Sequence, residues 1–227
     1  MGHPRRLAII PDGNRRFARK NGLSLGQAYA EGFRKVTDVL TWIRPTDIQS
    51  TTLWALSLEN FKKRSTLEVK LLFSLMESEM ERTMEKMPGS FPKIRFIGRT
   101  DLLPKKVQDL MKTLEKKTGN RARVLNVAVA YSGKEELVRA ATLAAESLKR
   151  GEIARIDDRA IEKNLYQPEP VDLLIRTGDV QRTSGFMPWQ NAYAEVYFSK
   201  KLWPDFSRKD FQDALSFYES TDRRFGQ

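Results

Sequence analysis

The chain has 227 residues, 40% of them hydrophobic and 30% charged, and 40 lysines and arginines against 29 aspartates and glutamates give it a net charge of +11. This composition is typical of a soluble globular protein, and no run approaches the ~20 apolar residues of a membrane-spanning helix. The absence of cysteine excludes disulfides, thiolate metal sites and cysteine nucleophiles. The excess positive charge indicates an anionic partner, which is nucleic acid, a lipid surface or a phosphorylated small molecule.

Apolar runs of strand length alternate with segments of helical periodicity along the chain. In chain order the patterns predict strand 7–10, helix 25–42, strand 51–57, helix 66–87, strand 93–98, helix 101–117, strand 123–131, helix 133–150, strand 171–178, strand 194–199 and helix 208–218. Strands separated by helices of this length predict an α/β fold with a mostly parallel sheet. Residues 150–160 are predicted as a loop, and no linker is evident, so we expect one domain over 1–227.

Polar residues directly follow the first predicted strand, and they are Asp12, Gly13, Asn14, Arg15 and Arg16. In open α/β sheets, ligands bind at the carboxyl ends of the strands. Arginine binds two phosphate oxygens at once, and glycine lets backbone N–H groups approach an anion. A carboxylate amid this positive charge suits a Mg²⁺ ion that bridges to phosphate oxygens. By itself, however, Asp-Gly-Asn is also a common turn sequence.

Similar side chains follow the second and fifth predicted strands. They are Ser57, Glu59 and Asn60 after the second, and Arg176, Arg182 and Ser184 after the fifth. Because parallel strands end at the same edge of a sheet, we expect these groups to gather there around phosphate or diphosphate. Glu195 lies near the last predicted strand.

Several familiar chemistries are excluded by missing motifs. The sequence contains neither a P-loop GxxxxGK[ST] nor a GxGxxG fingerprint. Its only histidine, His3, precedes the first predicted strand, so no histidine is available to activate Ser57 or Ser184. Acid–base chemistry therefore falls to carboxylates, tyrosine or substrate phosphate.

Five segments together resemble the cis-prenyltransferase family, of which undecaprenyl diphosphate synthase is the best-known type. They are IIPDGNRRFARKNG, TLWALSLENFKKR, NVAVAYSGKEELV, VDLLIRTGDVQRTSGFMPWQNAYAEVYF and LWPDF…RRFG. The resemblance implies a parallel six-stranded sheet flanked by helices, an apolar tunnel and a homodimer. It also implies Mg²⁺-dependent transfer of an allylic prenyl group from its diphosphate, commonly onto isopentenyl diphosphate, to make a Z-polyprenyl diphosphate.

The resemblance also assigns roles at the allylic-diphosphate side. Asp12 matches the residue that helps bind Mg²⁺ and promotes departure of the diphosphate. The residues expected to hold that diphosphate are Gly13, Asn14, Arg15, Arg16 and Tyr29. Phe17 is expected to support a dry apolar wall beside it.

The remaining roles concern the second substrate, the metal and the loops. Arg176, Arg182 and Ser184 match residues that bind the second diphosphate, and Glu195 matches a metal-linked acid. Asn60 matches an asparagine implicated in proton removal. The expected supporting residues are Ser57 and Glu59 beside Asn60, Arg64 (or Lys63) as a basic loop residue, Glu68 as a loop acid, and Arg224 with Gly226 as a motif that crosses the dimer interface.

Departures from the family pattern lie on the allylic side and keep alternatives open. Pro11, Arg15 and Phe17 stand where methionine, glycine and tryptophan are usual, and Leu25 and Tyr29 replace an arginine and a histidine. We expect Arg15 to restore the positive charge lost at Leu25. An atypical acceptor, including a hydroxyl, and a non-catalytic subunit of a heteromeric prenyltransferase stay open.

The expected location and partners follow from the same patterns. The partners that the resemblance implies are an allylic prenyl diphosphate and isopentenyl diphosphate, and no module or basic–aromatic interleaving favours nucleic acid. The sequence shows no signal peptide, so a cytoplasmic enzyme is expected, and peripheral contact with a membrane surface is left open.

Overall fold

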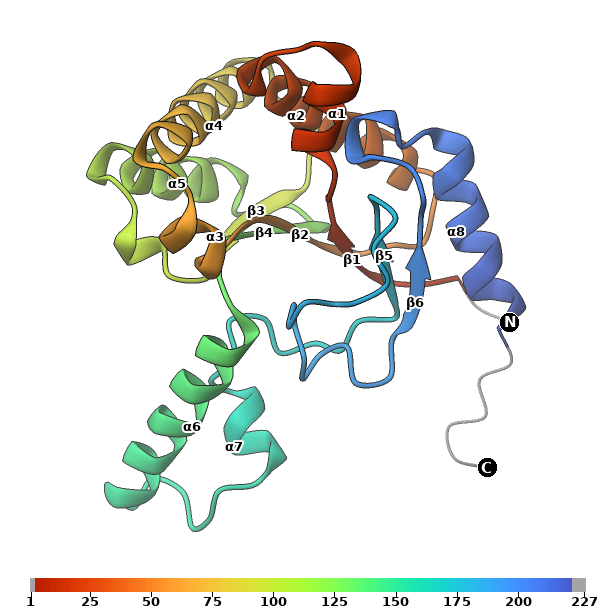
Figure 1. Cartoon of the computed structure of the whole chain (residues 1–227). Helices are drawn as coiled ribbons and strands as arrows, with labels where there is room; N and C mark the ends of the chain where they lie inside the picture. Colours follow the sequence, from red (N-terminus) through yellow and green to blue (C-terminus); the bar gives the residue numbers. More distant parts are fainter. Residues whose placement is uncertain (1–2, 222–227) are drawn as a thin grey trace.

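Six parallel strands form one sheet in the order β3-β4-β2-β1-β5-β6 in a computed structural model, which describes residues 3–221 (Figure 1). The strands are β1 (Arg6–Ile10), β2 (Ser50–Ser57), β3 (Lys93–Ile97), β4 (Val124–Tyr131), β5 (Leu173–Arg176) and β6 (Glu195–Phe198). Each neighbouring pair runs parallel. The predicted α/β fold with six strands flanked by helices is confirmed.

The helices include the five predicted ones and three others. They are α1 (Asn14–Asn21), α2 (Leu25–Ile43), α3 (Leu58–Lys63), α4 (Thr66–Lys86), α5 (Lys105–Thr118), α6 (Gly133–Lys149), α7 (Asp158–Glu162) and α8 (Arg208–Ser220), with 3-10 turns at Thr100–Leu102 and Trp203–Asp205. The sequence patterns do not predict α1, α3 and α7. The prediction of a loop over 150–160 is wrong where α7 begins, because the Asp157 carboxylate caps this helix by accepting a hydrogen bond from the Ala160 N–H.

The helices α1, α2, α4, α5 and α8 gather on one side of the sheet (Figure 1). Strand β1 shows how both faces are buried, because Leu7 and Ile9 join the larger apolar cluster while Ala8 and Ile10 join the smaller one. A strand buried on both faces reads as a continuous apolar run, which explains LAII.

The helices α6 and α7 stand off the other side of the sheet and pack against one another (Figure 1). The Arg139 guanidinium lies 3.9 Å from the centroid of the Tyr166 ring beside them. Val138, Leu148 and Ile156 are exposed in this region. The pair therefore presents apolar side chains that the described chain does not cover.

The position of β1 between β2 and β5 creates the crevice that holds the site. The connections run from β1 to β2 on one side, while β5 lies on the other, and ligands bind at such a switch point. Trp203 closes one end of this crevice, since its main-chain N–H donates to the Asp12 carbonyl (3.0 Å) and its indole Nε1–H donates to the Gly32 carbonyl (2.9 Å). The turn after β1 is thereby fixed to α2 and to the segment before α8.

Candidate active site

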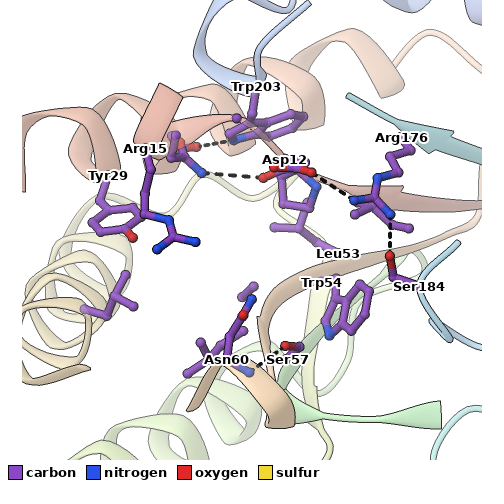
Figure 2. Close-up of a pocket in the computed structure, with 18 of the residues that line it drawn as sticks. Asp12, Arg15, Tyr29, Leu53, Trp54, Ser57, Asn60, Arg176, Ser184 and Trp203 are labelled. Atoms are coloured by element: carbon purple, nitrogen blue, oxygen red, sulfur yellow. Dashed lines mark hydrogen bonds and ion pairs between the residues drawn. The ribbon is translucent and has the colours of Figure 1, made fainter. Parts of the chain in front are cut away.

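Asp12 lies between two arginines at the carboxyl end of β1 (Figure 2). Its Oδ2 accepts a hydrogen bond from Arg176 Nη2 (2.9 Å), and its Oδ1 accepts one from Arg16 Nη2 (3.2 Å). The Asp12 side chain keeps about a third of its surface exposed and lines the cavity, so its carboxylate oxygens are accessible to a ligand in the cavity.

Arg176 is the buried cation of this cluster, with 5% of its surface exposed. Besides Asp12, its guanidinium donates from Nη1 to the Ser184 Oγ (2.7 Å) and to the Arg182 carbonyl (2.6 Å). Its Nε is buried without a hydrogen-bond partner in the described chain. The planar fork therefore holds the 182–184 loop around itself, and binding of a second diphosphate by these three residues stays a prediction.

Two glycines shape the turn and the contacts at the start of α1. Gly13 has φ +120°, which L side chains rarely adopt, and it provides no side-chain cap for α1. At Gly178 (φ +89°) a Cβ would lie 2.6 Å from Arg16 Nη2, so only glycine admits that guanidinium. The first-turn amides of a helix lack intrahelical acceptors and attract phosphate groups.

These groups open onto a cavity of about 1050 Å³ whose lining includes both basic and apolar side chains. Its cationic lining consists of Arg15, Arg16, Arg19, Arg64, Lys134, Arg176 and Arg182, against the carboxylates of Asp12 and Glu59. Its apolar lining includes Leu25, Phe33, Val36, Leu53, Leu72 and Met76. Such a cavity suits an anionic head group joined to an apolar chain.

Tyr29 lines the cavity, but its hydroxyl is bonded to protein. It donates to Glu68 Oε1 at 2.6 Å, and Arg64 Nε lies 3.4 Å from the same oxygen. Burial, together with the hydrogen bond to Glu68, raises the pKa of Tyr29 to about 12. Arg64 lines the cavity whereas the neighbouring Lys63 is exposed and does not, so Arg64 is the basic loop residue of the site.

The end of β2 brings a further polar group to the cavity (Figure 2). Ser57 caps α3 by accepting a hydrogen bond from the Asn60 N–H (3.0 Å), and Asn60 lines the cavity. Glu59 accepts a hydrogen bond from Ser132 Oγ (2.8 Å) at the end of β4. Both are placed at the sheet edge where the strand-end argument expects them.

Some predicted site residues are not brought into the cavity. Glu195 begins β6 opposite Leu173, whereas Phe198 is the residue opposite Arg176. Glu195 thus lies three residues, or about 10 Å, from the level of Arg176 toward the amino ends of the strands. Within one chain it is therefore too far from Asp12 for both carboxylates to bind the same metal ion. Phe17 is half-buried and Glu68 lies behind Tyr29 and Arg64, which both contact it, and neither Phe17 nor Glu68 lines the cavity. Arg224 and Gly226 lie outside the described residues.

The cavity also contains cations that the sequence argument missed. Arg19 lies one turn beyond Arg15 on α1, and Lys134 begins α6 directly after β4. Lys134 was detectable, because it follows a predicted strand just as Arg16 does. Arg19 was not, since no helix was predicted there.

A phosphate-binding crevice that continues into an apolar cavity defines an enzyme that acts on the diphosphates of apolar chains. The chain belongs to the undecaprenyl diphosphate synthase family, because residues 10–226 match the family described as "Putative undecaprenyl diphosphate synthase". It is therefore a prenyltransferase of the Z-isoprenyl diphosphate synthase type.

Individual relatives agree with this membership. The chain is 41% identical over 234 residues to a geranylgeranyl-diphosphate-specific tritrans,polycis-undecaprenyl-diphosphate synthase of Methanocaldococcus jannaschii, covering 99% of this chain and 83% of that protein. It is 40% identical to an isoprenyl transferase of Thermus thermophilus, over 99% and 89% of the two chains. The crystal structure of lavandulyl diphosphate synthase from Lavandula x intermedia in complex with dimethylallyl diphosphate superposes with a TM-score of 0.92 at 32% identity, covering 99% of each chain.

Proposed function

We propose that this enzyme transfers an allylic prenyl group from its diphosphate onto isopentenyl diphosphate and so lengthens a Z-polyprenyl diphosphate. The observation that carries the proposal is the two-ended cavity, in which the Asp12–Arg176 cluster meets an apolar lining that includes Phe33, Leu53 and Met76. The donor diphosphate binds at the α1 N-terminus with Arg15 and Arg16. The second diphosphate binds at Arg176, Arg182 and Ser184.

The chain's own residues support each stage of this reaction. When the allylic C–O bond breaks, the diphosphate leaves with the electron pair, and guanidinium and N–H groups stabilise its charge. The apolar lining excludes water from the carbocation. A C–C bond then forms to the terminal alkene carbon of isopentenyl diphosphate, which leaves a tertiary cation at C3 of that unit. Loss of a proton from the neighbouring carbon C2 restores a double bond. Asn60 is assigned to guide that proton to a phosphate oxygen or water.

Mg²⁺ belongs to the proposal because the donor set fits it. The described residues contain no group of three or more acidic, histidine or cysteine side chains that would make a protein-only metal site. Magnesium is commonly held by one or two carboxylates together with substrate phosphates and water. Asp12, exposed toward the diphosphate site, provides such a ligand, and the ion adds positive charge on the leaving group. Glu195 of the same chain is too distant to join it.

A radiolabel assay tests the proposed function. Purified protein is incubated with Mg²⁺, labelled isopentenyl diphosphate and either dimethylallyl or geranylgeranyl diphosphate, and butanol-extractable label is measured. We expect labelled polyprenyl diphosphate that disappears when Mg²⁺ is chelated. Release of donor diphosphate without incorporated label would indicate that the acceptor is not isopentenyl diphosphate but another nucleophile, such as a hydroxyl. If neither product forms, the proposal of an autonomous catalyst is overturned in favour of a partner subunit.

The proposed active form is a homodimer. The apolar side chains proposed to contact a second copy of the chain are exposed ones on or beside α6 and α7, namely Val138, Leu148 and Ile156, and Tyr193 at 89% exposure. Exposed apolar groups of this kind mark interaction surfaces. Sedimentation velocity should give a mass near twice 26.2 kDa, and Val138→Lys should shift the protein to monomer. A monomeric wild type would contradict the dimer.

The proposal also includes contact with an anionic membrane surface. Among the described residues no helix has the length and apolar character needed to cross a bilayer. Leu67, 80% exposed in the first turn of α4, is surrounded in sequence by the exposed Lys62, Lys63 and Lys70. Each lysine near an anionic leaflet contributes about 1 kcal/mol of attraction. Cosedimentation with vesicles containing phosphatidylglycerol tests this contact, and retention in the supernatant would exclude it.

A further inference from the structure

A three-residue network joins three helical segments beside the cavity. Tyr29 belongs to α2, Arg64 follows the last residue of α3, and Glu68 lies in the first turn of α4. The Tyr29 hydroxyl donates to Glu68 Oε1 (2.6 Å), and Arg64 Nε approaches the same oxygen (3.4 Å). The Arg64 guanidinium also lies 5.9 Å from the centroid of the Tyr29 ring. One carboxylate oxygen therefore connects residues that are 39 positions apart.

The network holds the bend between α3 and α4 in place. Arg64 has an extended backbone (φ −72°, ψ 154°) between α3 and α4. Ser65 then begins α4 by accepting a hydrogen bond from the Glu68 N–H. Without a contact to another element, this bend would be held only by its own helix caps. The bond from Tyr29 attaches it to α2, which also lines the cavity.

Burial distinguishes this network from the surface ion pairs of the molecule. Tyr29 is 6% exposed, and the side chains of Arg64 and Glu68 are 16% and 12% exposed. Shielded charges are screened less by solvent and salt than exposed ones. The network is therefore expected to hold its geometry at physiological ionic strength.

The contacts of Arg64 leave part of its guanidinium for a ligand. Glu68 lies nearest its Nε, and the two Nη groups make no hydrogen bond to the described part of the chain. Arg64 lines the cavity whereas Glu68 does not. Arg15 lies near Tyr29 (Figure 2), also lines the cavity, and makes no hydrogen bond or ion pair within residues 3–221. Two cationic side chains therefore lie near Tyr29: Arg15, which has no partner in the described chain, and Arg64, whose Nε alone lies near a carboxylate.

We propose that Tyr29 and Glu68 are positioning residues that hold Arg64 opposite Arg15, so that the two arginines grip the diphosphate of the allylic donor from both sides. Tyr29 acts through Glu68 and Arg64 and is not itself a ligand of the diphosphate. Burial keeps its hydroxyl protonated, with a pKa of about 12, so it donates to Glu68 throughout the neutral range. This inference rests on the proposed function, because it takes the allylic diphosphate as the anion that enters beside α1.

The test separates positioning from folding by removing single atoms. Tyr29→Phe keeps the ring and deletes the hydroxyl, and Glu68→Gln keeps a hydrogen-bond acceptor but removes the charge that faces Arg64. Hydrogen bonds to charged groups are strong enough for about a tenfold effect on binding. We expect KM for the allylic donor to rise about tenfold in each variant, with kcat and KM for isopentenyl diphosphate within about twofold of wild type. The double variant should lose no more than the larger single effect.

Tyr197→Phe is the matched control. Tyr197 of β6 packs against Phe217 of α8, does not line the cavity and makes no hydrogen bond in the described chain. It should leave every kinetic constant unchanged. Equal donor KM values for Tyr29→Phe and wild type would overturn the proposal, as would effects of the two single changes that add fully in the double variant.

A binding measurement keeps the test independent of turnover. Titration calorimetry with inorganic diphosphate should show about tenfold weaker binding to Tyr29→Phe and to Glu68→Gln than to wild type. If wild type fails to turn over any donor but the variants bind diphosphate more weakly, the proposed function is wrong and the positioning role stands. If wild type is active and the variants bind diphosphate equally well, only the positioning role is wrong.

Discussion

Asp12→Asn is expected to lower kcat/KM by about a thousandfold, because it removes the negative charge that pairs with both Arg16 and Arg176. The amide preserves the shape of the side chain and accepts one of its two hydrogen bonds. It offers Mg²⁺ a neutral oxygen and leaves the two guanidinium groups repelling one another. Steady-state kinetics with labelled isopentenyl diphosphate measures the loss, and a Mg²⁺ titration should show weaker dependence on the ion.

The control for this substitution is Asp38→Asn, which neutralises an exposed carboxylate on α2 that pairs with Lys35. It should retain wild-type kinetics. Thermal melting of both variants checks that each is folded. If Asp12→Asn keeps more than a tenth of the wild-type kcat/KM while folded, Asp12 has no central role in departure of the diphosphate.

Arg176→Lys is expected to lower kcat/KM by roughly a hundredfold and the free energy of unfolding by about 2–3 kcal/mol. The guanidinium donates to the Asp12 carboxylate, the Ser184 hydroxyl and the Arg182 carbonyl at once. A lysine ammonium is a compact donor that does not reproduce this planar fork. The 182–184 loop therefore loses its anchor, and the defect should appear mainly as a higher KM for the second substrate.

Arg6→Lys provides a matched comparison at the other end of the sheet. Arg6 pairs with Asp172 at 2.8 Å, but neither residue lines the cavity. This variant should keep wild-type KM values even if its melting temperature falls slightly. A wild-type KM for isopentenyl diphosphate in Arg176→Lys would place the second substrate elsewhere.

The fold was predictable wherever burial imposes a period on the sequence. All six strands and the five long helices carry apolar patterns that match the faces they bury. The helices α1, α3 and α7 are five to eight residues long and mostly polar. Their ends depend on capping and on contacts with the sheet, which a local pattern does not contain.

The site was predictable to the extent that it lies at strand ends. Asp12, Asn60 and Arg176 follow parallel strands, and the sheet brings them to one edge. Glu195 was expected among them, but it begins its strand and the register places it toward the opposite edge. The bond between Tyr29 and Glu68 was not predictable, because the relative placement of α2 and α4 is set by tertiary packing.

The central place of β1 has a consequence for how the molecule is assembled during synthesis. Its first partner, β2, is available once about sixty residues have left the ribosome. Its other partner, β5, comes much later, and the ion pair between Asp12, just after β1, and Arg176 of β5 spans 164 residues of sequence. Pairing at long sequence separation is slow and leaves a strand edge exposed in the meantime. A chain that ends before β5 therefore lacks Arg176, Arg182 and Ser184, and Asp12 lacks one of its two arginine partners. Activity arises in the same event that seals the last open edge of β1.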